Sequence, residues 1–192
     1  MKKSPNLRWG EWDSYDKQCE ILRKHHLQTW AAFTLGHDHD TVESIRRTHE
    51  FAMASKFCFA AYNILMPYPG TPLYDRLRRE GRLLWGGKWW LHPEYRFNHA
   101  AFVPRKMSPD DLTEACWRAR RDWNRPSAIF TRMWDFRTHM SSLTRLAVYL
   151  RYNPLYAKES FKKQGMLLGR FRGSSGMTDS VADPAVRVRA RM

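Results

Sequence analysis

The stretch FCFAAYNILMPYPGTPLYDRLRREGRL, residues 57–83, decides the fold of this chain. Its beginning, 57–66, is a continuous apolar run rich in aromatic side chains, which is typical of a strand covered on both faces. Pro67 and Pro69 have no backbone N–H to donate to a neighbouring strand, so the strand must end where they begin. The first element that the sequence predicts is therefore a buried strand that stops at a stiff corner.

A short helix is predicted directly after this corner. Gly70 can adopt the positive φ that the turn requires. Thr71 suits the N-cap, Pro72 the first helical position and Gly81 the residue after the last turn, which places the helix over 73–80. Such a corner can be purely structural or can line a ligand site, because ligands bind at the carboxyl ends of strands in α/β folds.

A second buried strand is predicted upstream, over the apolar segment TWAAFTLG at 29–36. The polar loop HDHDT follows it, and Asp40 with Glu43 three residues later has the spacing of a capping box. A helix is therefore expected from there to Lys56, followed by the strand over 57–66. Two buried strands joined through a helix form a βαβ unit, which implies parallel pairing and a right-handed crossover.

The rest of the chain is expected to be mainly helical. Apolar residues at three- and four-residue intervals predict an amphipathic helix over 12–28. Ser108 suits an N-cap and begins a helix that should reach Trp123, after one short strand near 101–103. Further helices are expected over 127–140, 142–152 and 155–168. The expected segments are a βαβ part, an aromatic-rich connecting segment, a helical region and a disordered basic tail: 1–84, 85–107, 108–169 and 170–192.

Composition indicates a folded protein without a membrane span. Hydrophobic residues make up 43% and aromatic residues 14% of the 192 residues, which excludes wholesale disorder. No apolar run is long enough to cross a bilayer, and the N-terminus lacks the apolar core of a secretory signal, so a cytoplasmic protein is expected. Cys19, Cys58 and Cys116 lie too far apart for a disulfide framework or a clustered metal site, and buried thiols are expected.

The net charge of +14 and the pI of about 10.1 raise nucleic acid or an anionic membrane as partners. Part of the excess lies in 170–192, which could attract nucleic acid nonspecifically, and the rest is equally explained by solvated helix faces. The segment WGGKWWLHPEYRF, 85–97, could stack bases between cations. A loop folded over an apolar barrel end is favoured instead, because no nucleic-acid-binding motif accompanies it.

The loop HDHD, 37–40, contains two histidines and two aspartates, which are residue types that bind metal ions. Neighbouring loop residues point in different directions, so a polar loop leading into a helix cap is the favoured interpretation. His25 and His26 are interpreted as surface or half-buried side chains. No catalytic residue and no metal ligand is therefore assigned to this chain.

Taken together, these motifs resemble the C-terminal part of radical S-adenosylmethionine (radical SAM) proteins. The resemblance covers 5–168 and is carried by AAFTLGHDHDT, FCFAAYNILMPYPGTPLYDRLRREGRL and FNHAAFVPRKMSPDDL. The signals LGxDxDT and PxPGTPLYxxLxxEGR are specific as a pair, and the subgroup that they resemble most often carries an N-terminal cobalamin-binding domain. The resemblance implies an α/β fold in which the two strands are the fifth and sixth, and last, of a partial (β/α)6 TIM-like barrel.

The resemblance also implies site residues. In that family the fifth-strand motif GxIxGxxE helps to shape the adenosine pocket, and only its second glycine is retained here. The matching positions are Ala32, Thr34, Gly36 and His39. The resemblance implies an adenosine-pocket wall formed by the backbone near Gly36 and by the apolar side chain of Leu65 or Met66.

The cofactors of that family need a motif that this sequence lacks. Radical chemistry in the family uses a CxxxCxxC loop whose thiolates bind a 4Fe-4S iron–sulfur cluster, on which S-adenosylmethionine binds. No such loop occurs among these residues. The expected function is that of a radical SAM enzyme fragment, with S-adenosylmethionine, the cluster and in some members cobalamin as cofactors of the intact enzyme and none for the isolated chain.

The resemblance and the charge together leave three interpretations of the chain, and each implies a different partner. A fragment would need the missing N-terminal barrel half or a companion radical SAM subunit. One alternative is a non-catalytic subunit that completes the barrel of another chain. The other alternative, from a different class of protein, is a basic nucleic-acid-binding module.

Overall fold

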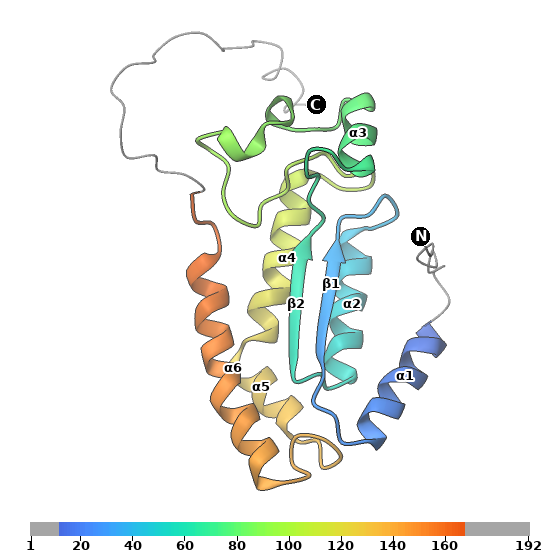
Figure 1. Ribbon diagram of the computed structural model, residues 1–192, viewed down its shortest axis with the longest axis vertical. Helices are drawn as coiled ribbons and strands as arrows, with labels where there is room; N and C mark the ends of the chain where they lie inside the picture. The colour runs from blue at the N-terminus through green and yellow to red at the C-terminus, as the bar shows by residue number, and fades with distance from the viewer. Residues whose placement is uncertain (1–11, 168–192) are drawn as a thin grey trace.

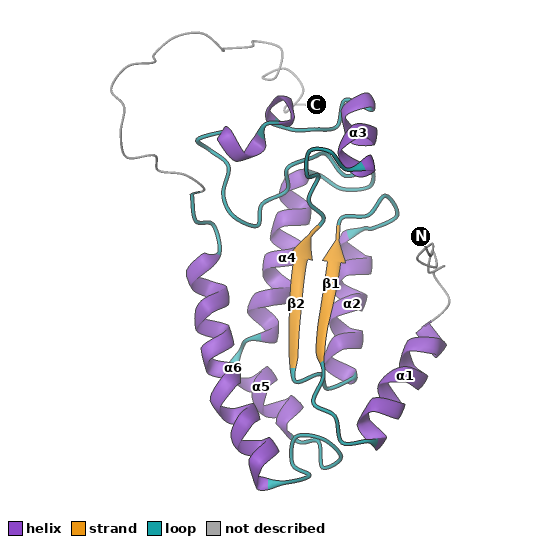
Figure 2. Cartoon of the chain, in the orientation of Figure 1, coloured by secondary structure: helices purple, strands orange, loops and turns teal. Residues whose placement is uncertain are grey.

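The structure is a computed structural model that describes residues 12–167; the rest of the chain, including the tail predicted over 170–192, lies outside the described residues. Two parallel strands form its centre, and helices make up most of the remainder (Figure 1, Figure 2). The predicted α/β class is confirmed for this part. In chain order the elements are α1 (Trp12–Lys24), β1 (Trp30–Leu35), α2 (Val42–Ala54), β2 (Phe59–Ile64), α3 (Pro72–Arg79), α4 (Pro109–Trp123), α5 (Pro126–Met133) and α6 (Leu143–Lys163).

The predicted βαβ unit is confirmed. β1 and β2 pair in parallel with Trp30 opposite Phe59 and Leu35 opposite Ile64, and α2 connects them. Both strands are shorter by one or more residues at each end than the apolar runs that predicted them. The described part of the sheet has two strands, so it closes no barrel.

Among the described residues, helices cover one face of the sheet along its length, whereas the opposite face is covered only near the amino ends, where Tyr156 of α6 packs on Trp30 and Phe59. The prediction of a strand buried on both faces is therefore wrong. Tyr62 of β2 packs with Ile45 of α2 and Leu112 of α4 in the main core. On the opposite face, Thr34 and Asn63 are register partners and both are exposed. The apolar runs alternate between a helix-covered face and an open face because the described helices α2 and α4 both pack on the same side.

The start of α2 differs from the prediction. Its N-cap is Thr41, which forms a capping box with Ser44: the Thr41 side chain accepts from the Ser44 N–H, and the Ser44 side chain accepts from the Thr41 N–H. Asp40 and Glu43 do not form the predicted box, because the Asp40 carboxylate accepts from the backbone N–H groups of Gly36 and of the next residue instead.

The corner after β2 is confirmed in detail. Thr71 is the N-cap of α3 and accepts from the Tyr74 N–H at 3.2 Å, with Pro72 at the first position. Gly70 and Gly81 both have positive φ, 78° and 66°, which is the conformation that favours glycine. Local signals were sufficient here because each acts within one turn of the residue that carries it.

The last helices are not divided as predicted. α5 ends at Met133, and α6 is one helix that runs through Pro154, where two separate helices were expected. Tyr149 and Asn153 are buried one turn apart on the face that α6 presents to the rest of the molecule, and Tyr156 continues that face beyond the proline. Packing of this face on both sides of the proline outweighs the hydrogen bond that the proline cannot donate. Within 12–167, no helix combines the length and the apolarity needed to cross a membrane.

Other predicted boundaries shift by a few residues. The helix predicted over 12–28 ends at Lys24, whereas α4 begins and ends where predicted. The connecting segment contains two 3-10 turns, Trp85–Gly87 and Trp89–Leu91. The short strand expected near 101–103 is reduced to one antiparallel bridge between Leu83 and Phe102.

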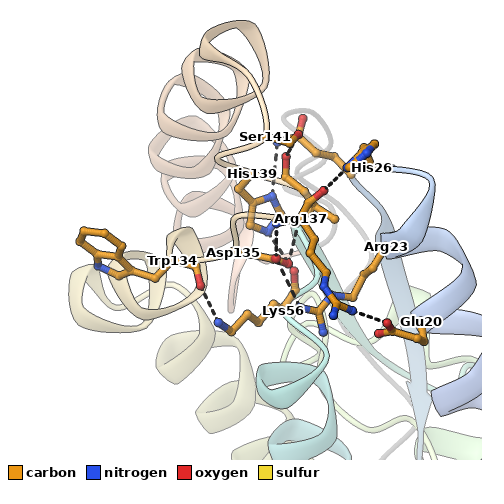
Figure 3. Close-up of polar contacts among 11 residues, drawn as sticks. Glu20, Arg23, His26, Lys56, Trp134, Asp135, Arg137, His139 and Ser141 are labelled. Atoms are coloured by element: carbon orange, nitrogen blue, oxygen red, sulfur yellow. Dashed lines mark hydrogen bonds and ion pairs between the residues drawn. The ribbon is translucent and has the colours of Figure 1, made fainter.

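A polar junction holds the loop between α5 and α6 against the elements at the amino ends of the strands (Figure 3). Arg23 of α1 lies 3.3 Å from the buried carboxylate of Asp135. Lys56 donates to the carbonyl oxygen of Trp134 at 2.5 Å, and His139 donates to the carbonyl oxygen of Lys56 at 2.9 Å. These contacts connect segments far apart in the chain and anchor the helical region to the βαβ unit.

Candidate functional site

The two sequence motifs meet at the carboxyl ends of β1 and β2. Because the strands are parallel and in register, Gly36 directly follows β1 where Leu65 directly follows β2. The Leu65 N–H donates to the carbonyl oxygen of Leu35 at 2.7 Å, which extends the ladder by one bond. The structure therefore brings the predicted site residues Gly36 and Leu65 to the same end of the sheet.

The residues predicted to form the adenosine-pocket wall pack against other parts of the protein. The Leu65 side chain packs against the main core, and Met66 packs against a separate aromatic cluster whose buried members are Trp89, Tyr95 and Ala101. The Gly36 N–H already donates to Asp40 at 2.8 Å. Any ligand at this end would therefore contact the partly buried edges of these side chains and the open face of the strands.

Gly36 is required by both conformation and space. Its φ is 104°, and an added Cβ would lie 2.7 Å from Leu112 Cδ2 and 3.3 Å from Phe102 Cζ. No L-residue with a side chain fits this position without a shift of its neighbours. The glycine thus lets the LGxDxDT motif turn tightly over the core at the carboxyl ends of the strands.

Asp38 connects the loop after β1 to the segment after β2. Its carboxylate accepts from Arg76 of α3 and from Arg82 Nη1 at 3.0 Å, and Arg105 Nε lies 3.5 Å away. Burial alone would raise the pKa of this carboxyl, but the hydrogen bonds from Arg82 and Arg76 outweigh burial and lower the pKa below its ordinary value. We call these residues, with Glu80, the Asp38 cluster.

Arg82 is the most enclosed cation of the Asp38 cluster. Its side chain is 13% exposed, its Nε donates to the carbonyl oxygen of Val103 at 2.7 Å, and its Nη1 also contacts Glu80 at 2.8 Å. Glu80 in turn accepts from Arg105 at 3.2 Å. The cluster therefore holds three segments together at the carboxyl ends of the strands: the HDHD loop, the end of α3 and the segment that leads to α4.

Replacing Asp38 by asparagine should destabilise the protein at neutral pH and have no effect at low pH. The pKa of Asp38 is lowered in the folded state, so its stabilisation is full above the ordinary aspartate pKa of about 4 and is lost as the pH falls through the lowered value. We expect a loss of about 1–2 kcal/mol at pH 7, because water screens the partly exposed Arg76 and Arg105.

Urea denaturation of Asp38→Asn and of the unsubstituted chain, repeated from neutral to acid pH, measures this difference. Asp75→Asn is the matched control, because Asp75 is an exposed aspartate on the same helix as Arg76. A difference between Asp38→Asn and the unsubstituted chain that is constant across the pH range would contradict the role given to the carboxylate.

The residues that could have been metal ligands mostly make contacts within the fold instead. Asp40 and Asp38 are occupied by backbone N–H groups and arginines, and within residues 12–167 no three His, Cys, Asp or Glu side chains gather around a metal position. His26 Nδ1 lies 2.6 Å from the carbonyl oxygen of Arg137, so this histidine is part of the polar junction. His37 and His39 are both exposed in the loop between β1 and α2.

The aromatic-basic segment is folded on itself. Trp89 and Tyr95 are buried, their ring centroids lie 4.7 Å apart, and Trp89 Nε1 donates to the carbonyl oxygen of Pro67 at 3.3 Å. The Tyr95 hydroxyl contacts Met66 Sδ at 3.9 Å. The two rings pack against each other at a tilt and contact the corner after β2, as the folded-loop interpretation expects, so these two are not presented to bases.

Sequence reasoning missed Arg120. It lies on the apolar stripe of α4, one turn from Cys116 and from Trp123, and this misplaced charge is the signal that could have revealed it. Its Nε donates to the carbonyl oxygen of Tyr62 at 2.5 Å and its Nη2 to Asn63 Oδ1 at 2.9 Å. Arg120 therefore occupies the outer edge of β2 and orients a polar side chain on the open face.

Two curated proteins are similar to this chain. Bacteriochlorophyllide d C-12(1)-methyltransferase of Chlorobaculum tepidum is 28% identical over 131 residues, which is 68% of this chain and 27% of that protein. Hopanoid C-2 methylase of Rhodopseudomonas palustris is 30% identical over 147 residues, which is 75% of this chain and 25% of that protein. The chain thus spans about a quarter of the length of the curated relatives that it matches. No protein-family model matches the chain, and no solved structure does.

Proposed function

We propose that residues 12–167 form the last two strands and the following helices of the S-adenosylmethionine-binding barrel of a radical methylase. The observation that carries the proposal is the Asp38 cluster, which joins the LGxDxDT motif to the PxPGTPLYxxLxxEGR motif at the carboxyl ends of parallel strands. The two similar proteins, whose names describe methyl transfer, support it. The reaction class is methyl transfer, for which S-adenosylmethionine would supply the methyl group.

The residues at the carboxyl ends of the strands fit the adenosine end of S-adenosylmethionine. Thr34 and Asn63 are opposite each other on the open face, one position before the strands end, and they present a hydroxyl and an amide. Small Ala32 leaves space beside them. Gly36 and Leu65, with Met66, would border the same position from the loops, as the family resemblance implies.

The iron–sulfur cluster does not fit the cysteines of this chain. All three are free thiols, and burial raises the pKa of Cys58 to about 12 and also raises the pKa of Cys116. Cluster ligands are thiolates that share one loop or pocket, and these groups favour the protonated form. The cluster would therefore be held by another segment of polypeptide, which is the N-terminal barrel half or a companion subunit.

The free edge of β1 is the place where such a segment would pair. Thr29 and Leu35 direct their carbonyl oxygens to β2, so alternation along the strand directs the backbone groups of Ala32 and Thr34 the other way. The outer edge of β2 is already occupied, because Arg120 and Tyr156 donate to its carbonyl oxygens. A strand can therefore add beside β1 and not beside β2.

The proposal predicts that Thr34→Val will weaken S-adenosylmethionine binding about 3–10-fold, because one hydrogen bond is lost while the strand shape is kept. The sample is the full chain, co-expressed and purified without oxygen together with a radical SAM polypeptide that carries CxxxCxxC, chosen as the proposed partner. Binding is measured by equilibrium dialysis with methyl-labelled S-adenosylmethionine, and labelled product is then extracted.

Thr144→Val, an exposed threonine substitution on α6, is the matched control and should change neither binding nor methyl transfer. The chain alone should produce no 5′-deoxyadenosine, and the pair should produce it together with labelled product. Cleavage of S-adenosylmethionine by the chain alone, with a cluster bound to it, would show that the incomplete-barrel proposal is wrong. Equal binding by Thr34→Val and Thr144→Val would remove Thr34 from the site.

A further inference from the structure

The end of the molecule opposite the candidate site exposes a group of large apolar side chains. They come from α5, from the loop after it and from the first turn of α6, at the amino ends of the strands (Figure 1). Their exposed fractions are 55% for Phe130, 45% for Trp134, 68% for Phe136 and 86% for Leu143. We call these four residues the α5–α6 tip. Large apolar side chains exposed together mark a docking surface more often than isolated ones do.

The rings of the α5–α6 tip form one patch rather than scattered exposures. The ring centroids of Phe130 and Trp134 lie 5.7 Å apart, and those of Trp134 and Phe136 lie 6.1 Å apart. In the close-up, the Trp134 side chain points away from the polar junction that surrounds its own backbone (Figure 3). Aromatic side chains therefore gather on the outer side of this loop.

The backbone beneath the patch is held firmly. Asp135, between Trp134 and Phe136, is buried; its carboxylate accepts from the Thr138 hydroxyl at 2.7 Å and from the Arg137 N–H at 3.0 Å. The outward position of the aromatic rings is thus not the result of a loose loop. A preorganised apolar patch loses little conformational entropy when it docks.

The chain segment that carries the patch has more basic than acidic residues. From residue 125 to residue 151 the chain contains a single acidic residue, Asp135, which is buried and paired with Arg23. The same stretch contains five arginines, of which Arg132 is buried in the core and Arg125 is paired with Asp122, which leaves Arg137, Arg145 and Arg151 at or near the surface. Arg137 is 62% exposed beside Phe136, and one of its guanidinium nitrogens is paired with Glu20. Aromatic and aliphatic side chains surrounded by arginines match the apolar and anionic layers of a membrane surface.

We propose that the α5–α6 tip docks on an anionic membrane surface, with its aromatic rings and Leu143 at the headgroup level and the neighbouring arginines on acidic headgroups. The charge favours this occupant over a second copy, because each copy carries +14 and would repel the other. The proposal concerns the opposite end of the molecule from the strand carboxyl ends and does not depend on the methylase proposal.

The test is flotation of the full chain with vesicles of phosphatidylcholine alone and of phosphatidylcholine mixed with phosphatidylglycerol. The chain should float with the mixed vesicles and much less with the neutral ones. The double substitution Phe136→Ser with Leu143→Ser should weaken binding to the mixed vesicles at least about tenfold, because two exposed apolar side chains no longer enter the interface. Phe136→Ser alone should have an intermediate effect, and both side chains are exposed enough for folding to be retained.

Leu91→Ser is the matched control, because Leu91 is 66% exposed in the segment at the other end of the strands. It should bind as the unsubstituted chain does. The positive residues outside the tip are present in every variant, so simple charge attraction cancels from the comparison. Equal binding by the double variant and Leu91→Ser would overturn the proposal. Absence of vesicle binding together with concentration-dependent dimerisation that the double variant abolishes would overturn it in favour of a second copy.

Discussion

Replacing Arg132 by alanine is expected to lower the free energy of unfolding by about 3–5 kcal/mol. Arg132 is completely buried, and its guanidinium carbon lies 3.5 Å from the centroid of the Trp123 ring. Its Nη1 donates to the carbonyl oxygen of Trp123 at 2.8 Å and its Nη2 to Asn153 Oδ1 at 3.3 Å. The side chain thus connects the ends of α4 and α5 to the middle of α6.

The expected loss combines two effects. Truncation leaves a cavity between helices, and it leaves the Trp123 carbonyl and the Asn153 amide without a buried donor. Burial lowers the pKa of Arg132, but a guanidinium does not lose its proton in proteins, so the side chain stays charged at neutral pH. Its charge is accommodated by the face of Trp123 and by neutral acceptors, which is a cation–π arrangement.

Urea denaturation followed by circular dichroism measures this loss. Arg125→Ala is the matched control: Arg125 is 57% exposed, and its replacement should change stability by no more than about 0.5 kcal/mol. Arg132→Met should be less destabilising than Arg132→Ala, because methionine refills most of the volume. If the two alanine variants unfold at the same urea concentration, the connecting role of Arg132 is wrong.

Replacing Gly36 by alanine is expected to cost about 2–5 kcal/mol, which combines backbone strain with overpacking. The φ of 104° is unfavourable for alanine, and the added Cβ would lie 2.7 Å from Leu112 Cδ2, inside the core that α4 and the sheet share. Neither the buried leucine nor the strand end can move without disturbing that core.

Gly70→Ala separates the two causes. Gly70 also has positive φ, 78°, but an added Cβ would meet nothing within 4 Å. This variant should show only the conformational cost of about 1–2 kcal/mol, and thermal or urea denaturation of both variants gives the difference due to packing. Equal losses for Gly36→Ala and Gly70→Ala would mean that the core yields to the new methyl group and that space does not require the glycine.

Elements with signals close together in the chain could be predicted from the sequence. The corner after β2 and the whole of α4 agree with the prediction, because an N-cap, a proline and a terminal glycine act on neighbouring backbone groups. The same local rules failed where tertiary packing competes. Pro154 does not end α6, since the buried face around Tyr149 and Asn153 continues past it. Asp40 does not cap α2, since its carboxylate already accepts from the loop before it.

The sequence by itself determined the order of strands and helices as far as α4, the parallel pairing and the place where the two motifs would meet. Only the tertiary structure decided which polar side chains act together. Asp38 pairs with Arg76 and Arg82, Arg120 occupies the β2 edge, and Arg132 lies against Trp123. Periodicity shows which face of an element is apolar, but the partner of a charged side chain comes from a distant part of the chain. Burial then makes that pairing obligatory, because an enclosed charge without a partner is too costly to keep.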